Sequence, residues 1–179
     1  RYTRTMFASY LLVPNPERVL LVGLGAGSMF RFLERYEPAL HVEAVDIDPL
    51  VVEVATKYFG THASERMTLT VADGVQHLRD ATQPYDVIYM DAFLRPSDTT
   101  DGSGVPLKLK TAGFYELMQD KLTACGAAVF NLHLDGGLER ELAPIRQAFA
   151  STHVFVVPRS KNHVVVATKR VTRADSGTL

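Results

Sequence analysis

Short apolar runs alternate with segments of helical periodicity along most of this chain. The runs are continuous, which is typical of strands that are buried on both faces of a sheet. They predict five strands, over residues 18–23, 41–46, 67–71, 85–91 and 127–134. Because strands that alternate with helices form right-handed βαβ units, we expect these five to make a mostly parallel sheet.

The segments between the strands carry apolar residues at helical spacing. Asp48 followed by Pro49 is a typical helix start, and Thr111 is suited to cap another helix. The pattern predicts helices over residues 2–13, 28–36, 49–59, 74–78, 111–122 and 138–150. Pro144 lies inside the last of these, where we expect it to kink or break the helix.

Two further strands are predicted near the end of the chain, over residues 153–157 and 164–168. The six residues between them suit an antiparallel hairpin. The expected fold is therefore α/β and Rossmann-like, a doubly wound, mostly parallel seven-stranded sheet with an antiparallel hairpin at the end. We expect one domain over residues 1–170, in which residues 1–16 form a linking helix, and a flexible tail over residues 171–179.

The composition limits the classes of function. The chain has 179 residues, 46% of them hydrophobic, and a formal net charge of −1, which suits one globular domain. This charge balance indicates neither a nucleic-acid nor a membrane partner. The six histidines show no metal spacing, so we expect no metal site. A single cysteine, Cys125, and the lack of a secretory signal favour a cytoplasmic location.

A glycine-rich turn joins the first strand to the next helix. Gly23, Gly25 and Gly27 would let the backbone turn tightly and approach a ligand near the amino terminus of that helix. A structural role explains such a turn about as well as a ligand does. The spacing departs from the dinucleotide pattern, since Ser28 stands at its sixth position, and this disfavours NAD.

Acidic residues follow the next two strands, at the edge where such sheets bind ligands. Asp46 is placed to accept hydrogen bonds from ribose hydroxyls, with Ile47 beside an adenine ring, whereas Asp48 is better suited to cap a helix. Asp73 and Gly74 could read the adenine amino group and ring, or could form an ordinary turn and helix cap. Ligand-type residues at three successive strand ends favour a nucleotide site over coincidence.

A fourth acid, Asp91, ends the fourth strand. A carboxylate there can orient a cationic amine and accept its proton, although an Asx turn is the structural alternative. The loop over residues 93–110, about 18 residues long, exceeds the usual connection length, which favours a lid over the site. Asn131 and His133 share one face of the fifth strand and are weaker candidates for the pocket.

These elements, in this order, resemble the spermidine synthase family of aminopropyltransferases, which has the class I methyltransferase fold. The resemblance covers roughly residues 2–134. It is carried by the segments RVLLVGLGAGSMFR, VDIDPLVVEVATKYFG, VADG, YDVIYMDAF and VPLKLKTAGFYELMQDKLTACGAAVFNLH.

The resemblance implies roles for three acids. Asp46 would hold the ribose, Asp73 the adenine, and Asp91 would contact the donor's aminopropyl amine and accept a proton. The donor would be decarboxylated S-adenosylmethionine, and an amine would attack the carbon next to its sulfur. The expected partner is therefore a small-molecule acceptor, an amine, and a homodimer is left open as the assembly.

The chain departs from the family pattern at polyamine contacts. Ala26 replaces an aspartate of the glycine-rich loop, and Leu94 replaces the second aspartate after the catalytic one. An alanine suits a donor that keeps its carboxylate, because an aspartate there would repel it. Two alternatives thus stay open, a methyltransferase that uses intact S-adenosylmethionine on a non-polyamine acceptor and a non-catalytic nucleoside-binding domain.

Overall fold

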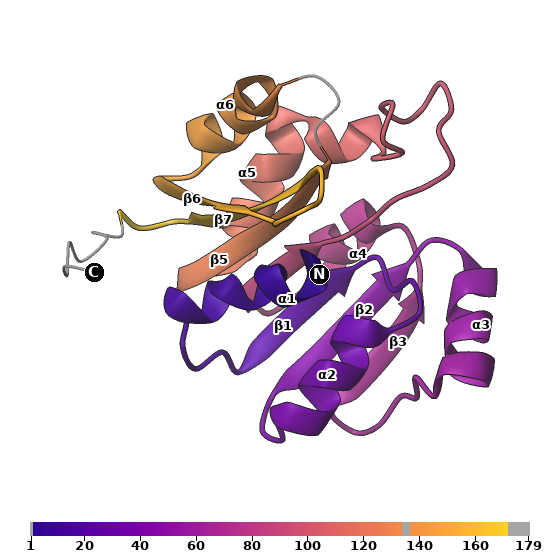
Figure 1. The fold of residues 1–179 in the computed structure, drawn as a ribbon. Helices are drawn as coiled ribbons and strands as arrows, with labels where there is room; N and C mark the ends of the chain where they lie inside the picture. Colours follow the sequence, from indigo (N-terminus) through magenta and orange to yellow (C-terminus); the bar gives the residue numbers. More distant parts are fainter. Residues whose placement is uncertain (1, 134–136, 172–179) are drawn as a thin grey trace.

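A seven-stranded sheet runs through the protein with helices to either side (Figure 1). The computed structural model describes residues 2–133 and 137–171. The strands are β1 (Arg18–Val22), β2 (His41–Asp46), β3 (Met67–Val71), β4 (Tyr85–Met90), β5 (Leu122–His133), β6 (Ser151–Val156) and β7 (Asn162–Thr168). Their order is β3-β2-β1-β4-β5-β7-β6. Strands β1 to β5 pair in parallel, and β7 pairs antiparallel with both β5 and β6. The predicted fold class is confirmed.

The helices follow the predicted pattern with local differences. They are α1 (Tyr2–Met6), η1 (Phe7–Leu11), α2 (Ser28–Tyr36), α3 (Pro49–Phe59), α4 (Gly74–Asp80), η2 (Leu107–Lys110), α5 (Ala112–Asp120) and α6 (Leu138–Ala148). The first predicted helix is a short α-helix continued by the 3-10 helix η1. A second 3-10 helix, η2, lies inside the predicted loop. Strand β5 begins at Leu122, earlier than predicted, because Tyr85 of β4 already pairs there. The expected tail from residue 172 and the last residue predicted for β5 lie outside the described residues.

Helix α6 runs through Pro144 without a break. The break that we considered for this position is therefore wrong. A proline inside a helix costs about 3 kcal/mol or more. Leu142 and Ile145, on either side of it, are fully buried, and each such side chain contributes about 1.5–3 kcal/mol. Burial of this helix face is thus sufficient to offset the lost backbone hydrogen bond.

Two hydrophobic cores cover the two faces of the sheet. In β1, Val19 and Leu21 belong to the core beneath α1, α2 and α3, while Leu20 and Val22 belong to the core beneath α4, α5 and α6. Successive side chains of a strand point to opposite faces, so a strand between two cores must be apolar at every position. The continuous apolar runs of the sequence have this cause. No helix in residues 2–133 and 137–171 has the length and apolar character needed to cross a membrane.

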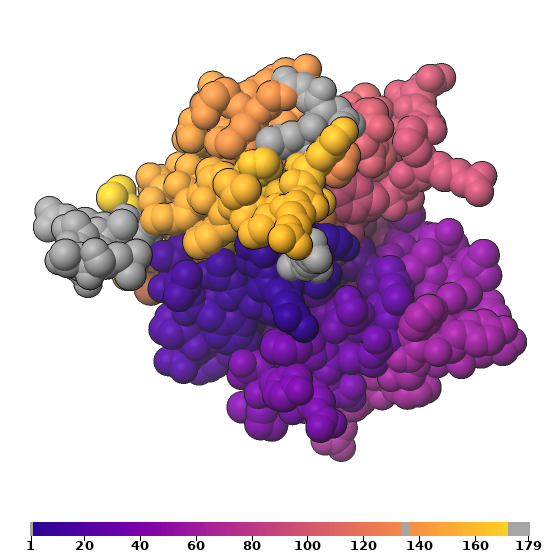
Figure 2. Space-filling model, in the orientation of Figure 1, coloured from indigo at the N-terminus to yellow at the C-terminus, as the bar shows by residue number. Residues whose placement is uncertain are grey.

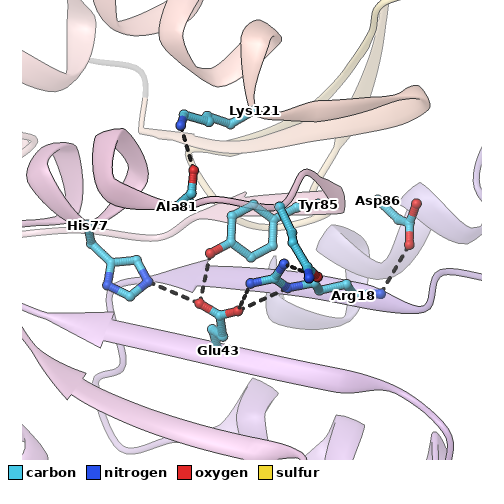
Figure 3. A network of polar contacts seen from close by, with 8 residues as sticks. Arg18, Glu43, His77, Ala81, Tyr85, Asp86 and Lys121 are labelled. Carbon is cyan, nitrogen blue, oxygen red and sulfur yellow. Dashed lines mark hydrogen bonds and ion pairs between the residues drawn. The ribbon is translucent and has the colours of Figure 1, made fainter.

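A polar network joins three strands and α4 away from the carboxyl ends of the sheet (Figure 3). Glu43 of β2 accepts hydrogen bonds from Arg18 Nε at 3.0 Å and from the Tyr85 hydroxyl at 2.8 Å. Its second oxygen also lies 3.2 Å from Nε2 of His77. Burial alone would raise the pKa of Glu43, but the bonds from His77, Arg18 and Tyr85 lower it to about 2. The ionised carboxylate therefore holds β1, β2 and β4 in register.

Replacing Glu43 by glutamine should lower the free energy of unfolding by about 1–3 kcal/mol at neutral pH, as expected for charge-assisted hydrogen bonds. The folded pKa lies below the ordinary value of 4.5, so this contribution is complete above that pH and is lost as the pH falls toward about 2. Urea unfolding of both proteins across this range measures the difference. Glu53→Gln on the exposed face of α3 is the control. An equal loss at every pH would contradict the assignment.

Candidate functional site

A cavity of about 980 Å³ opens at the carboxyl ends of β1, β2 and β4. Its walls are the turn after β1, the residues that follow β2, Asp91, and lid residues from Phe93 to Leu109. Its size and its mixture of apolar and polar walls suit a nucleoside-sized ligand. The predicted loop does line this cavity. The amino-terminal segment, drawn in indigo, packs beside the carboxyl-terminal strands (Figure 2). Its residue Tyr2 is part of the cavity wall.

The turn after β1 needs glycine for structural reasons at two positions. Gly23 has a φ of 95°, and a Cβ there would lie 2.3 Å from the main-chain oxygen of Asp91. Gly27 has a φ of 72° and caps α2, with the Thr61 side chain where its Cβ would be. Gly25 also has a positive φ, of 53°, but faces open space, and both Gly23 and Gly25 line the cavity. Gly23 thus lets the turn approach the end of β4.

Asp46 fixes the turn from the neighbouring strand. Its Oδ2 accepts the main-chain N–H of Leu24 at 2.8 Å, and its Oδ1 accepts that of Asp48 at 3.0 Å. Each oxygen keeps a lone pair that can face a ligand. Asp48 accepts the N–H of Leu50 at 2.9 Å, which confirms its interpretation as the cap of α3. Ile47 lines the cavity and is half exposed.

Asp73 caps α4, so its interpretation as a helix cap is confirmed. Oδ1 accepts the N–H groups of Val75 at 2.8 Å and Gln76 at 3.4 Å, and Oδ2 pairs with Lys108 of η2. Burial raises the pKa of this carboxyl, but the bonds from Lys108 and α4 lower it below its usual value. Gly74 lines the large cavity, whereas Asp73 lines a neighbouring one of about 480 Å³. The adenine contact stays a prediction.

The lid is fastened to the body at η2. Lys108 forms an ion pair with Asp73, at the start of α4. Lys110 forms ion pairs with Glu141 of α6 and, at 2.7 Å, with Asp101 of the lid. Burial raises the pKa of Asp101, but hydrogen bonds led by that of Lys110 bring it down to about 2. Between the lysines, Leu109 is buried and Leu107 faces the cavity. Ion pairs therefore join the end of the lid to the start of α4 on one side and to α6 on the other.

Asp91 is a second partly buried carboxylate of the cavity wall, after Asp46. It follows the fully buried residues of β4, and its Oδ2 accepts the Tyr2 hydroxyl at 3.1 Å. Its Oδ1 accepts Nδ2 of Asn131 at 2.8 Å. Burial raises the pKa of Asp91 above its usual value, and the bonds from Asn131 and Tyr2 oppose this only in part. Burial and the nearby carboxylate raise the pKa of Tyr2 to about 12, so the phenol stays a donor.

Some of the predicted site residues line the large cavity, and others lie outside it. The cavity brings together Gly23, Gly25, Asp46, Ile47, Gly74 and Asp91, whereas Gly27 and Asp73 are not among the residues that line it. Asn131 reaches the site through Asp91, while both Asn131 and His133 line a small cavity of about 30 Å³. Within the described residues no group of three or more His, Cys, Asp or Glu side chains is placed to hold a metal ion.

Nothing in the sequence indicated that two further polar residues, Lys108 and Asn162, belong to the site. Lys108 is one of several lysines near the end of a polar loop, and Asn162 lies in a predicted turn. Asn162 donates from Nδ2 to Oδ1 of Asn131 at 2.8 Å. The antiparallel pairing of β7 with β5 creates this contact, and that pairing follows from the fold and not from local sequence.

This strand order, and a ligand-sized cavity at the carboxyl ends of β1, β2 and β4, define the class I methyltransferase-like fold. The chain belongs to the spermine/spermidine synthase domain family, whose profile matches residues 2–168. It is 31% identical over 169 residues to a polyamine aminopropyltransferase of Vibrio vulnificus, covering 92% of this chain and 54% of that protein. The chain therefore spans about half the length of this relative.

Methyltransferases are also among its relatives. A mouse eEF1A lysine and N-terminal methyltransferase is 33% identical over 163 residues, which cover 87% of this chain and 23% of that protein. The crystal structure of human methyltransferase-like protein 13 in complex with SAH superposes with a TM-score of 0.84 at 28% identity. The match covers 99% of this chain and 84% of that one. These relatives are all transferases.

Gly23→Ala should lower the free energy of unfolding by about 2 kcal/mol or more, because the side chain would meet the Asp91 backbone in a conformation that alanine rarely adopts. Gly25→Ala, also at positive φ but in open space, is the matched control and should cost only about 1 kcal/mol. Chemical unfolding compares the two variants. An equal decrease in the free energy of unfolding would show that the close approach of Gly23 to the Asp91 backbone does not contribute to stability.

Proposed function

We propose that this domain binds S-adenosylmethionine or its decarboxylated form in the large cavity and transfers an alkyl group, aminopropyl by family resemblance, to an amine. The observation that carries the proposal is the Asp91 carboxylate. It lies on the cavity wall, and Tyr2 and Asn131 hold its two oxygens from opposite sides. Its raised pKa makes it a better proton acceptor than an exposed aspartate.

The nucleoside would lie along the ends of β1 and β2. Asp46 would accept hydrogen bonds from the ribose hydroxyls, and Ile47 would contact the adenine ring. The glycine turn, with Gly23, Gly25 and Gly27, would let the donor approach the backbone at the start of α2. Gly74 would border the adenine ring, and Asp73, the residue before it, would accept a hydrogen bond from the adenine amino group.

The reaction follows from the placement of Asp91. The acceptor amine attacks the carbon next to the sulfonium sulfur, a C–N bond forms, and the C–S bond breaks to leave a neutral thioether nucleoside. The nitrogen becomes positively charged and gives its proton to Asp91. In such a displacement the protein contributes mainly alignment of nucleophile and leaving group, together with the proton acceptor.

Methyl transfer is a second candidate, supported by two side chains of the cavity wall. Ala26 and Leu94 both line the cavity, and neither can bind an ammonium group. The wall thus offers no carboxylate at the two positions where the resemblance implies polyamine contacts, and Ala26 leaves room for a donor that keeps its own carboxylate. The similarity to the human methyltransferase solved in complex with SAH also supports methyl transfer.

The same proposal includes a single domain over residues 1–170 in a cytoplasmic setting, with a small amine as acceptor. The family match over residues 2–168 supports the domain limits. The single cysteine, which is exposed, supports a reducing compartment.

Asp91→Asn should reduce the rate of alkyl transfer by roughly 10²-fold or more, as expected for loss of a general base. Donor affinity should stay nearly unchanged, since the amide keeps the size of the carboxyl group. Asp46→Ala should do the reverse and weaken donor binding. Single-turnover kinetics and calorimetric titration separate the two effects. Full activity of Asp91→Asn would remove this residue from the mechanism.

Calorimetric titration of the wild type and of Ala26→Asp with both donors distinguishes aminopropyl from methyl transfer. The introduced carboxylate should repel the carboxylate of intact S-adenosylmethionine and attract the free amine of the decarboxylated donor. Tighter wild-type binding of the decarboxylated donor would favour aminopropyl transfer, and tighter binding of the intact donor would favour methyl transfer. Binding of neither donor would contradict the proposed function.

A further inference from the structure

A line of side-chain hydrogen bonds leads from the β6–β7 turn to Asp91. The Ser160 hydroxyl donates to Oδ1 of Asn162 at 2.5 Å. Nδ2 of Asn162 donates to Oδ1 of Asn131 at 2.8 Å, and Nδ2 of Asn131 donates to Oδ1 of Asp91 at 2.8 Å. These residues come from the end of β4, from β5, from β7 and from the turn before β7, so the line crosses the sheet.

The direction of every bond in this line is fixed by its last member. An ionised carboxylate can only accept, so Asn131 must turn its amide nitrogen toward Asp91. Its amide oxygen then faces Asn162, which must donate in turn. The oxygen of Asn162 is left to accept from Ser160. Reversing any one amide would place two oxygens against each other.

The backbone holds the distant end of the line in place. Ser160 Oγ also accepts the main-chain N–H of Asn162 at 3.1 Å, so these two residues bind each other twice. Val157 N–H donates to the Asn162 carbonyl at 3.3 Å and closes the turn. In the register of β5 with β7, Asn162 lies opposite His133, beside Asn131. The turn thus holds the side-chain amide of Asn162 with its nitrogen toward Asn131.

We propose that Asn162 is a positioning residue for the transfer reaction, which acts through Asn131 to orient the Asp91 carboxylate toward the acceptor amine. This inference rests on the proposed function. Without Asn162, the Asn131 amide can rotate and present its oxygen to Asp91, which removes a donor and repels the carboxylate. Only Tyr2 would then hold Asp91, by its other oxygen.

Other titratable groups line the same cavity as Asp91, and the substitutions tested leave them in place. Tyr2 from α1 is the titratable group bonded to it. The remaining titratable side chains of the same wall are Asp46, Asp48, Arg95, Asp98 and Lys108. Asn162→Leu changes none of these and introduces no charge, so a changed titration of Asp91 reports the lost hydrogen-bond line.

The test uses Asn162→Leu, which keeps the size of the side chain but cannot donate, and Ser160→Ala, an exposed site that frees the Asn162 amide. Lys161→Ala, exposed in the same turn, is the matched control. The titration of Asp91 is followed by ¹³C NMR of aspartate-labelled protein, and its signal is assigned by its loss in Asp91→Asn. Single-turnover transfer and calorimetric donor affinity are measured in parallel.

We expect the pKa of Asp91 to rise in Asn162→Leu, and to a lesser extent in Ser160→Ala. Transfer should slow by about 10-fold to 10²-fold in Asn162→Leu, as for a catalytic group that is displaced slightly, with donor affinity unchanged. A titration and rate equal to those of Lys161→Ala would overturn the proposal, as would a loss confined to donor affinity.

The two proposals can fail separately. If the wild type transfers no alkyl group to any amine, the proposed function fails, and the NMR titration alone decides whether Asn162 orients Asp91. If Asn162→Leu does not fold, Ser160→Ala decides in its place, with the same expected rise and the same contradicting result.

Discussion

The hydrogen bonds that converge on Asp91 set the requirements for much of the structure. A carboxylate at the edge of a buried strand is costly unless donors compensate for the water that it loses. One donor, Tyr2, comes from the first helix, and the other, Asn131, from a strand that lies late in the sequence. The site therefore needs α1 packed beside the carboxyl-terminal strands and β5 paired in one register.

Two sides of the cavity wall, the turn after β1 and the lid, are held in place in different ways. The turn after β1 is fixed by Asp46 and by the close approach of Gly23 to the end of β4. The end of the lid is instead attached by side-chain ion pairs, of Lys108 with Asp73 and of Lys110 with Glu141, and the first of these is the more exposed. One side of the cavity wall is therefore held by backbone geometry, and the other by contacts between side chains.

Donor and acceptor selection would depend on few side chains of a shared framework. The family match and the methyltransferase relatives have one fold in common, and fold alone does not determine the group transferred. In this chain Ala26 and Leu94 are the departures that face the cavity. They line the same cavity as Asp91 without contributing to its hydrogen bonds. Under the proposed function, specificity can therefore change while the proton acceptor is retained.

The sequence by itself determined the strands, the fold class, the caps at Asp48 and Asp73, and an acid at the end of β4, because each is encoded by neighbouring residues. It also suggested Asn131, whose position on a strand end is local information. It left open whether Pro144 would kink or break the last helix. It did not predict that Lys108 would pair with Asp73, or that Asn162 would donate a hydrogen bond to Asn131. Only the tertiary structure decided these, because they depend on which distant segments pack together and in which register their strands pair.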